Sequence, residues 1–229
     1  MFFCYAQNYK KRWNSQKNSL SLCEIDRVAI MEKYFNTAGP NQPDSQYTLN
    51  PLKRIDLAEI ELLFEQKKYF VLHAPRQTGK TSMLLALRDY LNAGGKYFCV
   101  YANINSIVDC DKVINEICTQ FANGVDKFID SPKYADEFEK KYLRATKSCW
   151  LTCFIEDVCR DFENPIVFLL NGIDNLEGDT FLSVIKQLRV GFNERPRRFP
   201  QTLIITGEEE LNYYNQYGKL FYEKMQLDM

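Results

Sequence analysis

One short segment narrows the possible folds of this chain more than any other. Residues 74–81, APRQTGKT, fit the pattern G-x-x-x-x-G-K-[ST] apart from an alanine in place of the first glycine. In such a loop the backbone N–H groups and the N-terminus of the following helix present positive partial charge to phosphate groups. The motif needs an apolar strand before it and an amphipathic helix after it, and the sequence supplies both. The segment therefore predicts a phosphate-binding P-loop.

Each fixed position of the segment has a chemical reason. Gly79 allows the chain to turn and to approach a ligand closely, because no Cβ intrudes. Lys80 supplies a positive charge for the β- and γ-phosphates of a nucleotide, and the Thr81 hydroxyl is the candidate Mg²⁺ ligand. The arginine at position 76 could reach a γ-phosphate. The candidate phosphate-binding residues are Ala74, Pro75, Arg76, Gln77, Thr78, Gly79, Lys80, Thr81 and Ser82.

The rest of the chain alternates between apolar runs and amphipathic stretches. Runs rich in β-forming residues predict strands at 68–74, 97–102, 165–170 and 201–206. Helical spacing predicts helices at 51–67, 80–92, 110–123, 134–162 and 180–190, the fourth with a break near Ala145. Strands that are apolar on both faces and separated by helices indicate a mostly parallel sheet covered on both sides. The predicted fold is α/β, a three-layer α/β/α core.

Composition and charge exclude several classes of protein. With 45% hydrophobic and 26% charged residues the chain reads as globular, and a formal charge of -1 gives no overall attraction to nucleic acid or anionic membrane. The chain has 8 cysteines, none of them in a C-x-x-C pair, and 1 histidine. This indicates reduced thiols instead of disulfides or a zinc site. Neither a signal peptide nor an apolar run of about 20 residues is found. We expect a cytoplasmic protein with no membrane partner, a loosely ordered leader at 1–33 and a P-loop domain at 34–229.

P-loop enzymes have a second conserved motif, a buried strand followed by acidic residues. The strand is clear in this sequence at 165–170, but the acidic residues do not follow it. P-loop NTPases place an acidic residue at the end of this strand to hold Mg²⁺, and many have a glutamate next to it to activate water. After the run at 165–170 the chain has Asn171 and Gly172, so no catalytic residue is certain. We expect Mg²⁺ to be weakly held and hydrolysis to be weak or absent, unless Glu177 or Asp109 replaces the missing acid.

Four long segments resemble the bacterial AAA-like ATP-binding proteins, which are related to the signal-transduction ATPases with numerous domains and to the origin-recognition type of AAA+ proteins. The segments are YFNTAGP at 34–40, YTLNPLKRIDL at 47–57, QKKYFVLHAPRQTGKTSMLLALRDYLNAGG at 66–95 and GDTFLSVIKQLRVGFNERPRRFPQ at 178–201. The resemblance runs from about Tyr34 to Tyr213. It implies ATP as the ligand and makes an alanine at position 74 normal. It also implies that the segment before the first helix packs over adenine, with Leu49, Pro51, Leu52 and Arg54 as candidates.

The chain departs from this family in three respects. Where the family reads Asp-Glu-Ile-Asp, residues 171–174 read Asn-Gly-Ile-Asp. Where it reads Gly-x-Arg-Asp, with the arginine as a nucleotide sensor, residues 207–210 read Gly-Glu-Glu-Glu. The sheet order of this class is 5-1-4-3-2, and we expect its fifth strand and its helical lid domain to be missing here. The strand at 68–74 would then form an exposed sheet edge, which is a liability for aggregation.

Three functions follow from these observations. The leading hypothesis is a P-loop protein that binds ATP and hydrolyses it weakly or not at all. One alternative is a nucleotide-gated interaction module, which would bind a protein partner or a second copy of the chain. The other is a DNA-linked ATPase, supported by the basic leader and by Arg195, Arg197 and Arg198. All three stay open at this level, as does the question whether the chain is an enzyme.

Overall fold

The structure is a computed structural model of the whole chain, and it describes residues 33–35, 44–107, 112–142, 149–176, 178–208 and 223–226. The chain divides into two compact units, Met1–Thr48 and Leu49–Met229. In the first unit the backbone of Tyr34 pairs with the segment around Gln46, through a 3.0 Å hydrogen bond from Tyr47 N to Tyr34 O. The leader expected at 1–33 lies almost wholly outside the described residues and stays a prediction.

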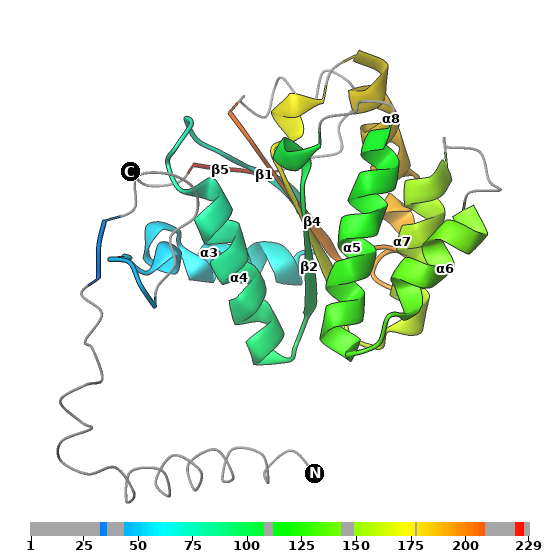
Figure 1. Cartoon of the computed structure of the whole chain (residues 1–229), viewed down its shortest axis with the longest axis horizontal. Coiled ribbons are helices and arrows are strands. Elements are labelled where there is room, and N and C mark those ends of the chain that lie inside the picture. The colour runs from blue at the N-terminus through cyan, green and yellow to red at the C-terminus, as the bar shows by residue number, and fades with distance from the viewer. Residues whose placement is uncertain are drawn as a thin grey trace, which may run out of the picture. The chain divides into compact units, whose positions relative to one another are not determined.

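The second unit is built on a parallel β-sheet (Figure 1). Its strands are β1 (Tyr69–His73), β2 (Phe98–Asn103), β3 (Ile166–Asn171), β4 (Thr202–Gly207) and β5 (Glu223–Gln226). They lie in the order β2-β3-β4-β1-β5, and each pair of neighbours is parallel. The predicted α/β class, the parallel sheet and the order 5-1-4-3-2 are confirmed.

The position expected for a missing fifth strand is occupied. Residues Glu223–Gln226 pair with β1 in parallel, with Phe70 opposite Glu223 and His73 opposite Gln226. The strand that leads into the P-loop therefore has a neighbour on each side, β4 and β5. The expectation that β1 would form an exposed edge is wrong, because a short segment after residue 222 takes the edge position instead.

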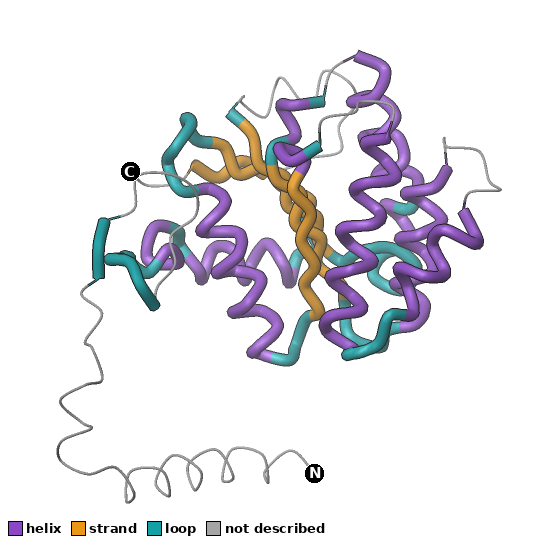
Figure 2. Tube along the Cα trace, in the orientation of Figure 1, coloured by secondary structure: helices purple, strands orange, loops and turns teal. Residues whose placement is uncertain are grey.

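Helices cover both faces of this sheet (Figure 2). The helical elements are η1 (Pro51–Arg54), α3 (Leu57–Glu65), α4 (Lys80–Gly94), η2 (Ile104–Ser106), α5 (Val113–Ile129), α6 (Lys133–Tyr142), α7 (Trp150–Asp161), η5 (Ile173–Asn175), α8 (Gly178–Val190) and η6 (Phe192–Glu194). Side chains alternate along β1: Phe70 and Leu72 pack with α3 and α4, whereas Tyr69 and Val71 pack with α5 to α8. None of the described helices combines the length and the apolar character needed to cross a membrane.

Two of the predicted helices are divided. The stretch 51–67 forms η1 and α3, because Asp56 has extended backbone and its carboxylate caps α3 by accepting from the N–H groups of Ala58 and Glu59. The stretch 134–162 forms α6 and α7, which confirms the predicted break, although residues 143–148 lie outside the described part. The other helices and strands agree with the predicted ranges, except that α5 continues to Ile129.

The cysteines agree with the prediction of reduced thiols as far as the structure describes them. Cys99, Cys118, Cys149, Cys153 and Cys159 are not joined in disulfides. Burial raises the pKa of the Cys118 thiol well above its ordinary value, so this side chain behaves as a small apolar core residue. The remaining cysteines, at positions 4, 23 and 110, lie outside the described residues.

Candidate phosphate-binding site

The P-loop connects the end of β1 to the start of α4, as the sequence predicts. Its turn uses left-handed backbone at Gln77, with φ 61°, and at Gly79, with φ 86°. A Cβ on Gly79 would lie 2.7 Å from Nη1 of Arg54, so a side chain here would both strain the backbone and displace that guanidinium. Gly79 directly precedes α4, whose first N–H groups have no partners within the helix. The loop therefore has the form that a phosphate site requires.

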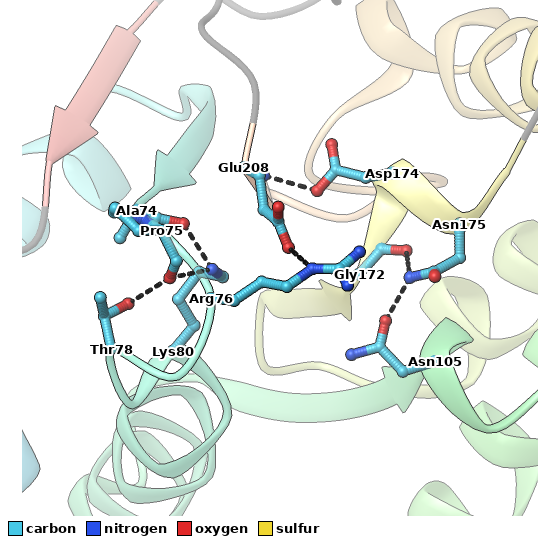
Figure 3. Close-up of polar contacts among 10 residues, drawn as sticks. All are labelled: Ala74, Pro75, Arg76, Thr78, Lys80, Asn105, Gly172, Asp174, Asn175 and Glu208. Atoms are coloured by element: carbon cyan, nitrogen blue, oxygen red, sulfur yellow. Dashed lines mark hydrogen bonds and ion pairs between the residues drawn. The ribbon is translucent and has the colours of Figure 1, made fainter.

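Lys80 lies against the loop itself. Its ammonium donates to the backbone oxygens of Ala74 and Pro75, the second at 2.8 Å (Figure 3). Burial lowers the pKa of Lys80 below its ordinary 10.5, and the carboxylates of Glu208 and Asp174 oppose this change. The amine is thus held at the mouth of the loop as a partly desolvated cation, which suits it to phosphate binding.

Arg54 joins the segment before α3 to the P-loop. Its Nη1 donates to the backbone oxygen of Thr78, and the Thr78 hydroxyl in turn donates to Pro75 O at 2.8 Å. Leu52 is partly buried against the core formed by α3 and α4, whereas Leu49 is 87% exposed. The structure thus brings Arg54 to the loop, and adenine contacts by Leu49, Pro51 and Leu52 stay a prediction.

Asn171 is buried at the end of β3, beside the P-loop helix. It is 1% exposed, and its Nδ2 lies 3.1 Å from Thr81 Oγ1, 3.2 Å from the Tyr101 hydroxyl and 3.0 Å from Asn103 Oδ1. Its Oδ1 accepts a 2.6 Å hydrogen bond from the Thr206 hydroxyl. Asn171 is therefore the residue of β3 that meets the candidate Mg²⁺ ligand Thr81.

The network around Asn171 fixes which way its amide points. Asn103 Oδ1 accepts from the backbone N–H of Asn105 at 3.2 Å, so this atom is an acceptor. The Asn171 atom 3.0 Å from it must therefore be the donor Nδ2, and the Thr206 hydroxyl then donates to Asn171 Oδ1. The amide nitrogen then faces Thr81. An N–H donor therefore lies at the position where a carboxylate would accept a hydrogen bond from the Thr81 hydroxyl and would attract a metal ion.

Gly172 has a backbone conformation that disfavours a catalytic glutamate. Its φ is 81°, a left-handed conformation that side chains rarely adopt, and a Cβ would overlap the side-chain oxygen of Asn105 and lie 2.6 Å from its Cγ. The exposed Asn105 side chain accepts from Asn175 Nδ2, which also donates to Gly172 O at 3.0 Å (Figure 3). A side chain at position 172 would have to adopt the left-handed backbone and displace Asn105.

Arg76 reaches across the site to the end of β4. Its Nε lies 2.7 Å from Oε1 of Glu208, the residue that directly follows β4 (Figure 3). The backbone N–H of Glu208 donates to Asp174 Oδ2 at 2.5 Å, which connects the same point to η5. This ion pair cannot be predicted from local sequence, because its partners lie 132 positions apart.

The amide network was also absent from the predicted site. Its members are Tyr101, Asn103, Asn105, Asn175 and Thr206. A signal does exist for some of them, since Asn103 ends β2 and Asn171 ends β3, and the carboxyl ends of neighbouring parallel strands meet at one sheet edge. Of the acids considered as replacements, Glu177 and Asp109 lie outside the described residues. Within the described part of the chain, no group of three or more histidine, cysteine, aspartate and glutamate side chains could hold a metal ion.

Arg195, one of the arginines considered for DNA contact, packs against aromatic rings of its own chain. Its guanidinium lies 3.5 Å from the centroid of the Phe192 ring and 4.7 Å from that of Tyr69, and it donates to the backbone oxygens of Lys67 and Phe192. These contacts place Arg195 within the packing between η6 and β1. Arg197 and Arg198 are exposed.

No protein-family model and no curated protein matches the sequence. Solved structures do match the fold. The structure of Drosophila ORC bound to poly(dA/dT) DNA and Cdc6 is similar with a TM-score of 0.51 and 9% identity, over 75% of this chain and 28% of that chain. Drosophila ORC bound to AT-rich DNA and Cdc6 is similar with a TM-score of 0.50 and 10% identity, over 76% of this chain and 28% of that chain. Cdc6p from Pyrobaculum aerophilum has a TM-score of 0.47 and 15% identity, over 75% of this chain and 44% of that chain.

About three quarters of this chain shares its fold with the Drosophila ORC structures, 75% in one comparison and 76% in the other. The chain spans less than half the length of each of these solved chains. The likeness concerns the fold, and the residues that would act on a ligand are those of this chain alone.

Proposed function

We propose that this protein binds adenine nucleotides, ATP included, at the P-loop and hydrolyses ATP weakly or not at all. Support for binding comes from the loop geometry: left-handed Gly79, the first N–H groups of α4, and Lys80 held at the mouth of the loop. A nucleotide phosphate fits these groups, because they offer donors and positive charge. Adenine as the base rests on the family resemblance.

The observation that carries the hydrolysis part is the pair of residues after β3. Asn171 presents an N–H group to Thr81, and Gly172 has no side chain and a left-handed backbone that disfavours one. Mg²⁺ bound with ATP would polarise its phosphates, and Thr81 is the described residue placed to hold it. The neutral amide beside Thr81 gives that ion no charge partner. Loss of the general base alone costs roughly 10²–10⁴ in rate.

The direct test is calorimetric titration of the purified chain with ATP and with ADP, each with Mg²⁺ and with EDTA. We expect binding that depends little on Mg²⁺ and is lost in Lys80→Ala. The matched control is Lys96→Ala, which removes an exposed lysine at the far end of α4 and should leave affinity unchanged. Single-turnover hydrolysis in the same samples should remain near the background rate. Absence of binding by a folded sample would reject the proposal, and rapid turnover abolished by Lys80→Ala would reject its hydrolysis part.

A nucleotide-gated interaction module is a second candidate, and the Arg76–Glu208 pair favours it. The two side chains are 83% and 39% exposed, so a ligand that draws Arg76 toward its phosphates would alter the surface beside β4. Protease digestion with and without nucleotide tests this, and identical digestion patterns would argue against it. DNA association has less support, since Arg195 is engaged inside the fold.

A further inference from the structure

The ion pair between Arg76 and Glu208 ties the P-loop to the end of β4, and phosphate binding does not require it. Its 2.7 Å separation joins the loop to a strand from a distant part of the sequence. Glu208 is held in place from behind, because its backbone N–H donates to the Asp174 carboxylate at 2.5 Å. Figure 3 shows the Glu208 carboxylate directed toward the loop. Arg76 therefore meets an anion of the protein itself.

The same carboxylates act on the second cation of the loop. Burial lowers the pKa of Lys80, and the charges of Glu208 and of Asp174 act against this by favouring its protonated form. Three described cations lie at the loop: Arg76 is paired with Glu208, Lys80 is in the field of two carboxylates, and Arg54 donates to Thr78 O. The amides that complete this side of the site, Asn171 among them, are neutral. An incoming phosphate chain meets a site in which two carboxylates already offset part of the positive charge, and Glu208 is paired with Arg76.

We propose that this site prefers a nucleoside diphosphate to the corresponding triphosphate, and that Glu208 sets the preference. The inference rests on the proposed nucleotide-binding function. The phosphates of a diphosphate can use the loop N–H groups and Lys80 while the pair Arg76–Glu208 stays closed. A γ-phosphate adds negative charge on the side of the loop where Glu208 already occupies the guanidinium of Arg76. The triphosphate must displace that carboxylate or bind beside it.

Repulsion, not the strength of the ion pair, is the source of the preference. An exposed pair such as this one contributes little by itself, since Arg76 is 83% exposed. The Glu208 carboxylate and a γ-phosphate beside it carry like charges and repel each other. Salt weakens this repulsion because the site is open to solvent. Mg²⁺ would offset part of the repulsion, but the amide of Asn171 gives the ion no carboxylate. The preference should therefore be largest at low salt and in EDTA.

The test compares ADP and ATP by competition against one fluorescent ADP analogue, in EDTA and in Mg²⁺, at low and at high salt. We expect wild type in EDTA at low salt to bind ADP at least about tenfold more tightly than ATP, which is about 1.4 kcal/mol. Glu208→Gln should bring the ratio close to one, mainly by tightening ATP binding. Glu65→Gln is the matched control, because it also removes an exposed carboxylate from an ion pair, far from the loop, and should leave the ratio unchanged.

The outcomes separate this inference from the function on which it rests. Loss of binding for both nucleotides would reject the nucleotide-binding function itself. Wild type that binds both equally, or ATP more tightly, would overturn the preference and leave the binding function standing. A ratio that persists in Glu208→Gln would overturn the role of Glu208. Should Glu208→Gln unfold, as judged by circular dichroism, the wild-type ratio and its decline with salt decide the question alone.

Discussion

The side-chain nitrogen of Asn171 lies 3.1 Å from the hydroxyl oxygen of Thr81. This contact joins the end of β3 to the first turn of α4, at the place where a P-loop enzyme has a carboxylate opposite a metal-binding hydroxyl. In this chain the same place between strand and helix holds a neutral amide instead of a carboxylate. The amide of Asn171 is hydrogen-bonded within a buried network. Single substitutions at this position can therefore test its role.

Asn171→Asp should make nucleotide binding depend on Mg²⁺. The new carboxylate would accept from Thr81, Thr206 and Tyr101, whose hydroxyls can all donate, and it would attract the ion. Without metal the buried charge should lower the free energy of unfolding by about 1–3 kcal/mol. Calorimetry with and without Mg²⁺, beside urea unfolding of the apo protein, measures both effects. Affinity in Asn171→Asp that is indifferent to Mg²⁺ would contradict the assigned role of Asn171.

Gly172→Ala should destabilise the fold more than a left-handed glycine alone explains. The matched control is Gly95→Ala, because Gly95 has φ 68° with nothing within 4 Å of an added Cβ, whereas Gly172 has φ 81° with Asn105 in the way. We expect Gly95→Ala to cost about 1–2 kcal/mol. Gly172→Ala should cost at least about 1 kcal/mol more, because of overpacking. Urea unfolding of both variants checks this, and equal losses would mean that Asn105 moves aside easily.

Gly172→Glu should accordingly fail to restore hydrolysis, even in an Asn171→Asp background. The glutamate backbone would have to leave the conformation that positions the N–H of residue 172 on Thr206. Single-turnover measurement with ATP and Mg²⁺ tests the double variant. A large gain in rate would show that the closed geometry at this position opens readily.

Lys80→Met should leave the apo protein as stable as wild type, or more so, at neutral pH. The folded pKa of Lys80 is lowered, chiefly by burial, so the folded protein binds this proton less tightly than the unfolded chain does. At neutral pH the charge therefore costs stability, and the cost disappears as the pH rises through the folded pKa toward 10.5. Thermal unfolding at pH 7 and pH 10 should show a difference between variant and wild type that shrinks at the higher pH.

Lys96→Met provides the control of opposite sign. The pKa of Lys96 is raised, first by its hydrogen bond to Tyr97 and then by that to Glu65, so its charge at neutral pH does not oppose folding. This variant should not gain stability. ADP should raise the Tm of wild type and of Lys96→Met but not that of Lys80→Met, because only a bound ligand shifts the unfolding equilibrium. A marked destabilisation in apo Lys80→Met would show that the amine mainly supports the loop.

Arg195→Gln should lower stability by about 1–2 kcal/mol, through lost stacking on Phe192 and Tyr69 and a lost hydrogen bond to Lys67 O. Arg197→Gln changes an exposed arginine in the same loop and should stay within about 0.5 kcal/mol of wild type. Chemical unfolding measures both. If Arg195 instead serves DNA, Arg195→Gln would weaken DNA binding without a loss of stability.

Much of the fold follows from local sequence, because the signals are local. The run YFVLH of β1 is buried at every position, and the residues from Ala74 to Gly79 form a loop whose backbone is dictated by Gly79 and the start of α4. Asn171 and Gly172 were also assigned correctly to the end of β3, since the buried strand ends where its apolar run ends. These elements require no knowledge of distant parts of the chain.

What the sequence did not provide depends on pairing between distant residues. The strand Glu223–Gln226 reads EKMQ, which contains no β-branched or aromatic residue, and it becomes a strand because it pairs with β1. The Arg76–Glu208 pair and the Asn105–Gly172 contact arise only after β2, β3, β4 and the loop meet at one edge of the sheet. An aspartate at position 56 is a possible N-cap, and this signal would have predicted the division of 51–67 into two helices. The helical spacing of the apolar residues across the whole stretch predicts one helix instead.

The pairing of Phe70 with Glu223 also orders events during synthesis. β1 leaves the ribosome early, whereas the residues that cover its second side are made 153 positions later. Both sides of the strand that carries the phosphate loop are open until β4 is made, and one side stays open until β5 is made, so another nascent chain can pair there. Translation speed between β1 and β5, and the chaperones present in that interval, therefore bear on the yield of protein with an intact site more than on the stability of the folded sheet.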